Sequence, residues 1–157
     1  REKPDYAGAD PAGNSVALLN LLRLEQFTTQ YAYRERAEEG LKTFSQHLNS
    51  RGSALPKMLC ALDYYLDRPL QIAIVQPRAQ PVDERFSQIL AEVFIPNQAL
   101  THVQEGSDLE RMQTSVPWLQ SKKALNGKTT AYICRGSVCE LPTNEPSKFK
   151  EGLLRYQ

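Results

Sequence analysis

The chain has 157 residues, of which 41% are hydrophobic and 24% are charged, and its formal net charge is +1. A nearly neutral chain lacks the concentrated lysine and arginine that phosphate recognition requires, so a nucleic-acid partner is not expected. No apolar run approaches the roughly 18 residues that a membrane-spanning helix needs, so no membrane segment is expected either. This composition is typical of a soluble globular protein with one domain or two small halves.

The cysteine content and the start of the chain predict a cellular location. Three cysteines do not form the even-numbered disulfide framework of small secreted proteins. Residues 1–5 are mostly charged and lack the apolar core of a signal peptide. We therefore expect a reducing, intracellular compartment, the cytoplasm first. The missing initiator methionine suggests a processed or excerpted chain.

Residues 1–69 show helical periodicity. Asp10 and Pro11 form a plausible helix start, because aspartate is a good N-cap and proline suits the first helical position. The following segment, about 14–27, is apolar on nearly every side, which is typical of a buried helix. Apolar residues at one-sided helical spacing predict a second helix over 37–48 and a third over 55–66, separated by a turn. Short loops between these helices predict αα-hairpins.

The periodicity changes at Pro69. Residues 70–75 form a short apolar run rich in β-branched residues, which predicts a buried strand. A helical face over 83–94 and a second strand over 99–104 complete a βαβ unit, which predicts two parallel neighbouring strands. A third strand over 129–134 and a closing helix over 147–156 follow. We therefore expect a small three-layer α/β unit with a mostly parallel sheet.

Four stretches, in order along the chain, resemble the C-terminal region of the spermatogenesis-associated protein 20 family. They are "GADPAGNSVALLNLLRL" (8–24), "ALPKMLCALDYYL" (54–66), "VFIPNQAL" (93–100) and "NGKTTAYICRGSVCELPTNEP" (126–146). The resemblance implies a longer protein with a thioredoxin-like N-terminal domain and an α/α toroid of the six-hairpin glycosidase type. It also implies that residues 1–69 are the last hairpins of that toroid and residues 70–157 a C-terminal α/β unit.

Cys134 and Cys139, separated by four residues, are the first candidate site. A structural zinc site needs four ligands, and neither His47 nor His102 stands at a ligand spacing, so no metal is expected. A dithiol redox site usually has a Cys-x-x-Cys motif at a helix N-terminus, whereas this pair flanks a predicted turn at the end of a strand. The resembling family has a similar pair, which permits a disulfide or a local redox role. The residues themselves favour structural thiols packed in the sheet.

The segment around Asp10, Asn14 and Ser15 is the second candidate. Free amide groups at a helix N-terminus, with these side chains beside them, could bind a sugar hydroxyl or an anion. The alternative is purely local: these residue types also cap helices and satisfy backbone groups. Asp63 and Asp67 look like paired glycosidase carboxylates, but their i, i+4 spacing on one helix favours a solvated face. Trp118 and the Tyr64-Tyr65 pair could stack on sugar rings, although core packing is their usual role.

Three functional hypotheses follow. The resemblance implies a carbohydrate-active protein with a sugar-like ligand, whose catalytic groups lie largely outside this chain and which needs no cofactor here. The alternatives are a non-catalytic structural or docking module, and a redox partner that uses Cys134 and Cys139. The docking hypothesis predicts an exposed apolar patch along Val16, Leu19 and Leu22, which would be covered by missing N-terminal domains of the same protein or by self-association.

Overall fold

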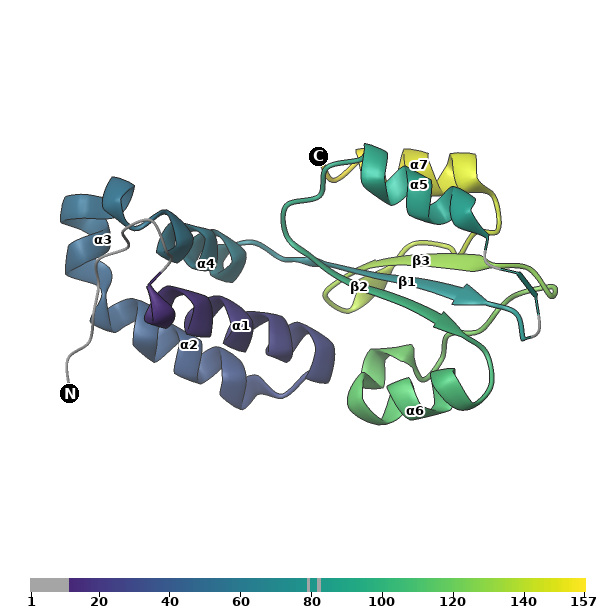
Figure 1. The fold of residues 1–157 in the computed structure, drawn as a ribbon, viewed down its shortest axis with the longest axis horizontal. Helices are drawn as coiled ribbons and strands as arrows, with labels where there is room; N and C mark the ends of the chain where they lie inside the picture. The colour runs from purple at the N-terminus through teal and green to yellow at the C-terminus, as the bar shows by residue number, and fades with distance from the viewer. Residues whose placement is uncertain (1–11, 79, 82) are drawn as a thin grey trace. The chain divides into compact units, whose positions relative to one another are not determined.

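A computed structural model describes residues 12–78, 80–81 and 83–157 of the chain, and Figure 1 shows its elements. The chain divides into two compact units at the boundary between Arg68 and Pro69. The first unit is helical and the second contains a sheet, so each is described by itself. Within the described residues, no helix is long and apolar enough to cross a membrane.

The helical unit consists of α-helices joined by short connections. The predicted helices are present, although the second is divided: α2 ends and α3 begins on either side of Phe44. Helix α1 packs against both α2 and α4. The elements of this unit are α1 (Gly13–Thr28), α2 (Tyr31–Thr43), α3 (Ser45–Arg51), the 3-10 helix η1 (Gly52–Ala54) and α4 (Pro56–Leu66).

Helix α1 begins later than the sequence indicates. Its N-cap is Ala12, which has no side chain able to accept a hydrogen bond, and its first helical residue is Gly13. The prediction that Asp10 and Pro11 start the helix is therefore wrong by two residues. Asp10 itself lies outside the described residues.

The apolar face of α1 is covered, contrary to expectation. Leu19 and Leu22 are only 4% and 0% exposed and Val16 is half-buried, so the prediction of an exposed patch along these three residues is wrong. Helices α2 and α4 supply the covering side chains, and Gly40 of α2 lies so close to Leu18 that an added Cβ would overlap its side chain. The buried cluster consists of Leu18, Leu19, Leu22, Ala37, Leu41, Phe44, Leu55, Met58, Ala61 and Tyr64.

The second unit contains one sheet of four strands in the order β2-β1-β3-β4. Strands β1 and β2 are parallel neighbours joined through α5, which confirms the predicted βαβ unit. The elements are β1 (Leu70–Gln76), α5 (Glu84–Glu92), β2 (Gln98–Gln104), α6 (Ser107–Ser115), the 3-10 helix η2 (Pro117–Leu119), β3 (Thr130–Arg135), β4 (Val138–Cys139) and α7 (Pro146–Leu154).

The expectation of a mostly parallel sheet is wrong. Strand β3 pairs antiparallel with β1, and β4 pairs antiparallel with β3, so one of the three pairings is parallel. The reason lies in the connections. The chain leaves β2 through α6 and η2 and enters β3 from the end of the sheet where β1 finishes. A two-residue hairpin then joins β3 to β4, and such a short loop can connect only antiparallel strands.

The sheet lies between two layers of helices, with α5 and α7 on one face and α6 on the other (Figure 1). Alternate side chains of the central strands β1 and β3 face α5 and α7, as the period of two in a strand requires. Phe86 and Phe149, from α5 and α7, are both fully buried, and their ring centroids lie 5.5 Å apart. The core on this face consists of Leu70, Ile72, Ile74, Phe86, Ile89, Val93, Ile95, Ala131, Ile133, Phe149 and Leu153.

Candidate functional site

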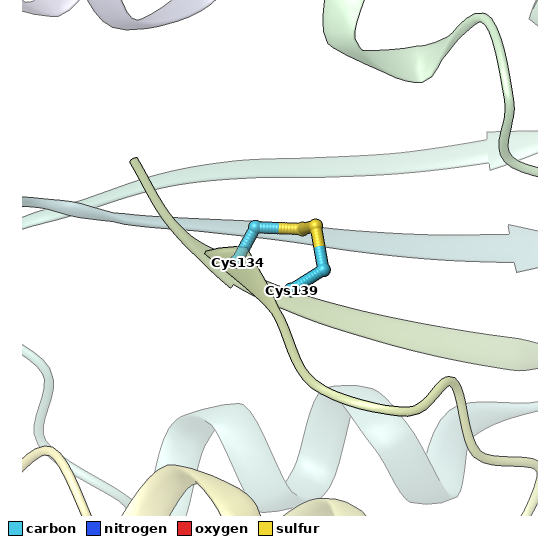
Figure 2. The surroundings of a disulfide bond; sticks show 2 residues. All are labelled: Cys134 and Cys139. Carbon is cyan, nitrogen blue, oxygen red and sulfur yellow. A yellow bond between two sulfur atoms is a disulfide. The ribbon is translucent and has the colours of Figure 1, made fainter. Parts of the chain in front are cut away.

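Cys134 and Cys139 form a disulfide that joins β3 to β4 (Figure 2). The two cysteines are directly opposite each other, next to the Gly136-Ser137 turn. Gly136 has a φ of 62°, which a glycine in the first central position of a two-residue hairpin adopts readily. The Glu140 amide donates to the Ile133 carbonyl at 2.9 Å, so the cysteine pair occupies the adjacent non-hydrogen-bonded position, where facing side chains lie closest.

The two halves of the disulfide differ in exposure. Cys134 is 2% exposed, whereas Cys139 belongs to the short edge strand β4, whose two residues are both exposed. The interpretation as two structural thiols packed in the sheet is therefore corrected: the two sulfurs are bonded to each other, as the family resemblance permitted. Because cysteine binds zinc as a thiolate, the pair offers no metal ligand while it is oxidised. Within the described residues, no group of three or more His, Cys, Asp or Glu side chains could hold a metal ion.

A cavity of about 650 Å³ lies beside this hairpin. Its walls are β3, the connecting segment 140–145 and one face of α7. Lys148 and Glu151 of α7 and Arg155 just after it line the cavity, spaced three and four residues apart as one helix face requires. Ile133 and Leu141 add apolar surface, so the cavity offers both charged and apolar groups to a ligand.

Segment 140–145, here called the wall segment, is bound to β3 at both ends. At the hairpin end, the disulfide and the bond from Glu140 to Ile133 hold it. At the other end, Ala131 and Thr143 exchange two backbone bonds of 2.8 and 3.0 Å. Between these two attachments the wall segment advances three residues, from Glu140 to Thr143, whereas β3 advances two, from Ile133 to Ala131. One extra residue opposite a strand is a β-bulge. Leu141, within the bulge, is 92% exposed.

Asn144 fixes the far end of the wall segment. Its Nδ2 donates to Thr130 Oγ1 at 2.7 Å and to the Thr129 carbonyl at 2.9 Å. Thr130 is fully buried and also accepts from the Leu125 amide at 2.8 Å. These bonds tie the wall segment to the start of β3, independently of the disulfide.

Glu140, the residue after Cys139, contacts the C-terminal part of α7. Its carboxylate lies 3.5 Å from the Arg155 guanidinium, and Tyr156 donates a hydrogen bond to it. Burial, together with this hydrogen bond, raises the pKa of the Tyr156 phenol above its ordinary value. An added Cβ on Gly152 would lie 3.0 Å from Glu140 Oε2 and 2.8 Å from Ile133 Cδ1, so a glycine lets the carboxylate approach the helix backbone. Sequence reasoning missed Glu140 and Asn144, because neither belongs to a recognised motif.

The second predicted site is only partly described. Asn14 and Ser15 lie in the first turn of α1, whereas Asp10 falls outside the described residues. Asn14 is half-buried. Ser15 is fully buried, and its Oγ has no hydrogen-bond partner among the described residues. Because the Ser15 side chain has no exposed surface, sugar binding there stays a prediction.

The other side chains weighed from the sequence have local structural surroundings that do not form a shared site. Asp67 caps the end of α4, and its Oδ1 accepts from the Arg68 amide at 2.7 Å. Tyr64 is buried, and the Arg34 guanidinium lies 4.4 Å from the centroid of the Tyr65 ring. His102 lies exposed on β2, where partial burial lowers its pKa.

Trp118 contributes to a cluster around a buried lysine. Lys122 is 6% exposed, and its Nζ lies 5.6 Å from the Trp118 ring centroid and 5.1 Å from that of Tyr132. Burial lowers the pKa of Lys122. The Tyr132 hydroxyl donates to the Lys123 carbonyl at 2.7 Å and so fixes this segment on the sheet. These contacts give Trp118 and Tyr132 a structural role.

The sequence was compared with protein-family models, with solved structures and with curated proteins, and the curated proteins include similar sequences. No family model matches the chain, and no solved structure matches it. It is 30% identical over 151 residues to spermatogenesis-associated protein 20 of Homo sapiens and 28% identical over 152 residues to the Mus musculus protein of that name. It is also 30% identical over 148 residues to an uncharacterised protein of Caenorhabditis elegans.

These alignments include 94% to 96% of this chain but only 19% to 20% of each relative, so the chain spans about a fifth of their length. The resemblance read from the four sequence stretches is therefore confirmed as homology along nearly the whole chain. The chain is homologous to one segment of the proteins of the spermatogenesis-associated protein 20 family.

Proposed function

We propose that this chain is a non-catalytic module of a longer protein, and that its own chemistry is reversible thiol–disulfide exchange at Cys134 and Cys139. One observation carries the proposal: the disulfide joins a buried cysteine to an exposed one in a two-residue edge strand. An incoming thiol needs access to one sulfur, and an edge hairpin can accommodate the geometry of attack without unfolding the sheet.

The exchange has two steps. A thiolate of a partner dithiol attacks Cys139 Sγ, the bond between the two chain sulfurs breaks, and its electron pair leaves with Cys134 Sγ as a thiolate that takes up a proton. The second partner thiolate then attacks the partner sulfur of the mixed disulfide and releases Cys139 as a thiol. Two electrons pass to the chain, and the partner ends as a disulfide.

The partner that this chemistry requires is a dithiol protein. The resemblance to the longer family implies a thioredoxin-like domain elsewhere in the same protein, and such a domain would supply two thiols at high effective concentration. The intracellular location expected from the sequence supports reversibility as well. Disulfides in a reducing compartment are usually transient, catalytic or redox-sensing, whereas permanent ones are typical of secreted proteins.

The same resemblance implies a six-hairpin, glycosidase-like toroid. We propose that any carbohydrate chemistry belongs to the remaining four-fifths of such a protein and that this chain supports it structurally. The local role of Asp67 supports the proposal that the carbohydrate chemistry lies outside this chain. Asp63 and Asp67 were the candidates for paired glycosidase carboxylates, and Asp67 instead caps the end of α4. A fold shared with glycosidases would not by itself assign a reaction to this segment.

The proposal can be tested with a thioredoxin that lacks its resolving cysteine and therefore remains attached to its target. The free thiol of Cys60 is exposed, so a Cys60→Ser background removes the competing site. We expect a mixed disulfide that peptide mapping locates at Cys139, and we expect the intact dithiol thioredoxin to reduce the pair much faster than glutathione does. Attachment at Cys134, or a disulfide that resists the dithiol protein although the chain stays folded, would overturn the proposal.

A further inference from the structure

We infer that the Cys134–Cys139 disulfide acts as a clasp on one wall of the 650 Å³ cavity, so that its reduction loosens the wall segment at the hairpin end and detaches Glu140 from α7. The inference rests on the proposed function, because it requires a disulfide that opens reversibly. It assigns a consequence to the exchange, namely a change in the shape of the cavity.

The hairpin end of the wall segment depends on the disulfide, because few other contacts attach it to the rest of the unit. Strand β4 has two residues, both exposed, and Val138 is 72% exposed. The ion pair of Glu140 with Arg155 spans 3.5 Å, and the arginine side chain is 66% exposed, so solvent weakens this pair. Apart from these contacts, the start of the wall segment has the hydrogen bond that Tyr156 donates to Glu140 and one backbone bond, from Glu140 to Ile133.

The far end of the wall segment is held by hydrogen bonds that do not involve the disulfide and should persist when it is reduced. Ala131 and Thr143 exchange two backbone bonds, and the side chain of Asn144 donates to Thr129 and Thr130. Between the two ends lie Leu141 and Pro142, and proline has no amide hydrogen to donate. The wall segment is therefore attached in a redox-dependent way at the hairpin end and in a redox-independent way at the far end. Reduction should let the hairpin end move while the far end stays attached to β3.

Glu140 transmits the change to α7. Its carboxylate lies against Gly152, in the last turn of that helix, and contacts Arg155 and Tyr156, which directly follow the helix. Because Glu140 is bonded directly to Cys139, freeing the cysteine also frees the carboxylate. Two charged groups that meet across the cavity, Glu140 and Arg155, then separate and become available to a ligand.

The size of the effect follows from the length of the closed loop. The cysteines are five residues apart in sequence, so the disulfide closes a six-residue loop. Loop-closure entropy for six residues corresponds to a factor of about 40 in the equilibrium between closed and open forms. Reduction should therefore raise the open population at the hairpin end by at most about 40-fold.

Amide hydrogen exchange at single-residue resolution, measured by NMR, tests the inference. We expect the Glu140 amide to exchange up to about 40-fold faster after reduction by a phosphine, while the amides of Ala131 and Thr143 change little. The Cys134→Ser/Cys139→Ser variant should reproduce this pattern without any reductant. The matched control is Asn144→Ala in the oxidised chain, which should reverse the pattern by accelerating Thr143 and sparing Glu140.

Unchanged exchange at Glu140, or equal acceleration at Glu140 and Thr143, would overturn the inference. The serine variant also separates this failure from failure of the proposed function. If that variant loosens the hairpin end but no dithiol protein reduces the native disulfide, the inference about the wall segment is supported and the proposed thiol–disulfide exchange is refuted. If the dithiol protein reduces the disulfide but amide hydrogen exchange at Glu140 stays unchanged, the proposed function is supported and the inference about the wall segment is refuted.

Discussion

Replacing Asn144 with alanine should destabilise the α/β unit through the far end of the wall segment. The variant loses two donated hydrogen bonds, to Thr130 Oγ1 at 2.7 Å and to the Thr129 carbonyl at 2.9 Å. Each such bond contributes about 0.5 to 1.5 kcal/mol net, so the free energy of unfolding should fall by about 2 kcal/mol. The loss should not exceed this value by much, because the Thr130 hydroxyl keeps two other partners in the variant: it accepts from the Leu125 amide at 2.8 Å and donates to the Lys128 carbonyl at 3.0 Å.

Urea unfolding followed by the fluorescence of Trp118, the single tryptophan of the chain, measures this loss within the α/β unit. Asn144→Asp keeps the side-chain size but replaces the donor with a carboxylate, so it should lose at least as much stability at pH 7. It should regain part of that loss at acid pH, where the protonated carboxyl can donate one bond. Gln88→Ala, on the exposed surface of α5, is the control and should change stability by less than about 0.5 kcal/mol. A loss below about 0.5 kcal/mol in both Asn144 variants would refute the reasoning.

Two further changes have definite expected results. Replacing both Cys134 and Cys139 with serine should lower the unfolding free energy of the α/β unit by about 2 kcal/mol, which is the loop-closure contribution of a six-residue loop. The same fluorescence assay measures this loss. An unchanged unfolding free energy would show that the disulfide does not constrain the unfolded chain. Tyr64→Phe should stabilise the helical unit by about 1 to 2 kcal/mol in far-UV circular dichroism, since the buried Tyr64 hydroxyl has no hydrogen-bond partner among the described residues. Burial raises the pKa of Tyr64 from 10.0 to about 12, so the folded phenol stays neutral where the unfolded one ionises, and native stability should fall between these pH values in a way that the phenylalanine variant lacks.

The parallel pair could be predicted from the sequence because its signals are local. Residues 70–75 and 99–104 have strand character, and the segment between them has the period of a helix and ends with the turn residues Pro96 and Asn97. The antiparallel pairing of β3 could not be predicted in the same way. Residues 130–134 are all buried, and an apolar run of this kind does not reveal the direction of its neighbour. Helix α6 was missed because its sequence is mostly polar and only Leu109 is buried.

The candidate site was predicted in part. The Gly136-Ser137 turn was visible in the sequence, and a two-residue hairpin places Cys134 opposite Cys139, but the same spacing also suits two separate thiols. Asn144 and Glu140 could not be predicted, because their roles depend on partners on other elements, Thr130 on β3 and Arg155 just after α7. The bulge had one weak signal, Pro142, which cannot donate to a regular ladder.

The proposed function depends on reversible exchange of Cys134 and Cys139 with cellular thiols. Its most direct test is a redox titration of the Cys60→Ser chain in glutathione and dithiothreitol buffers, with the fraction reduced measured by alkylation and mass spectrometry. We expect a midpoint between about −200 and −300 mV, within the range of intracellular thiol poise. A pair that stays oxidised below about −320 mV would be a permanent staple of the hairpin, and would contradict the proposed function.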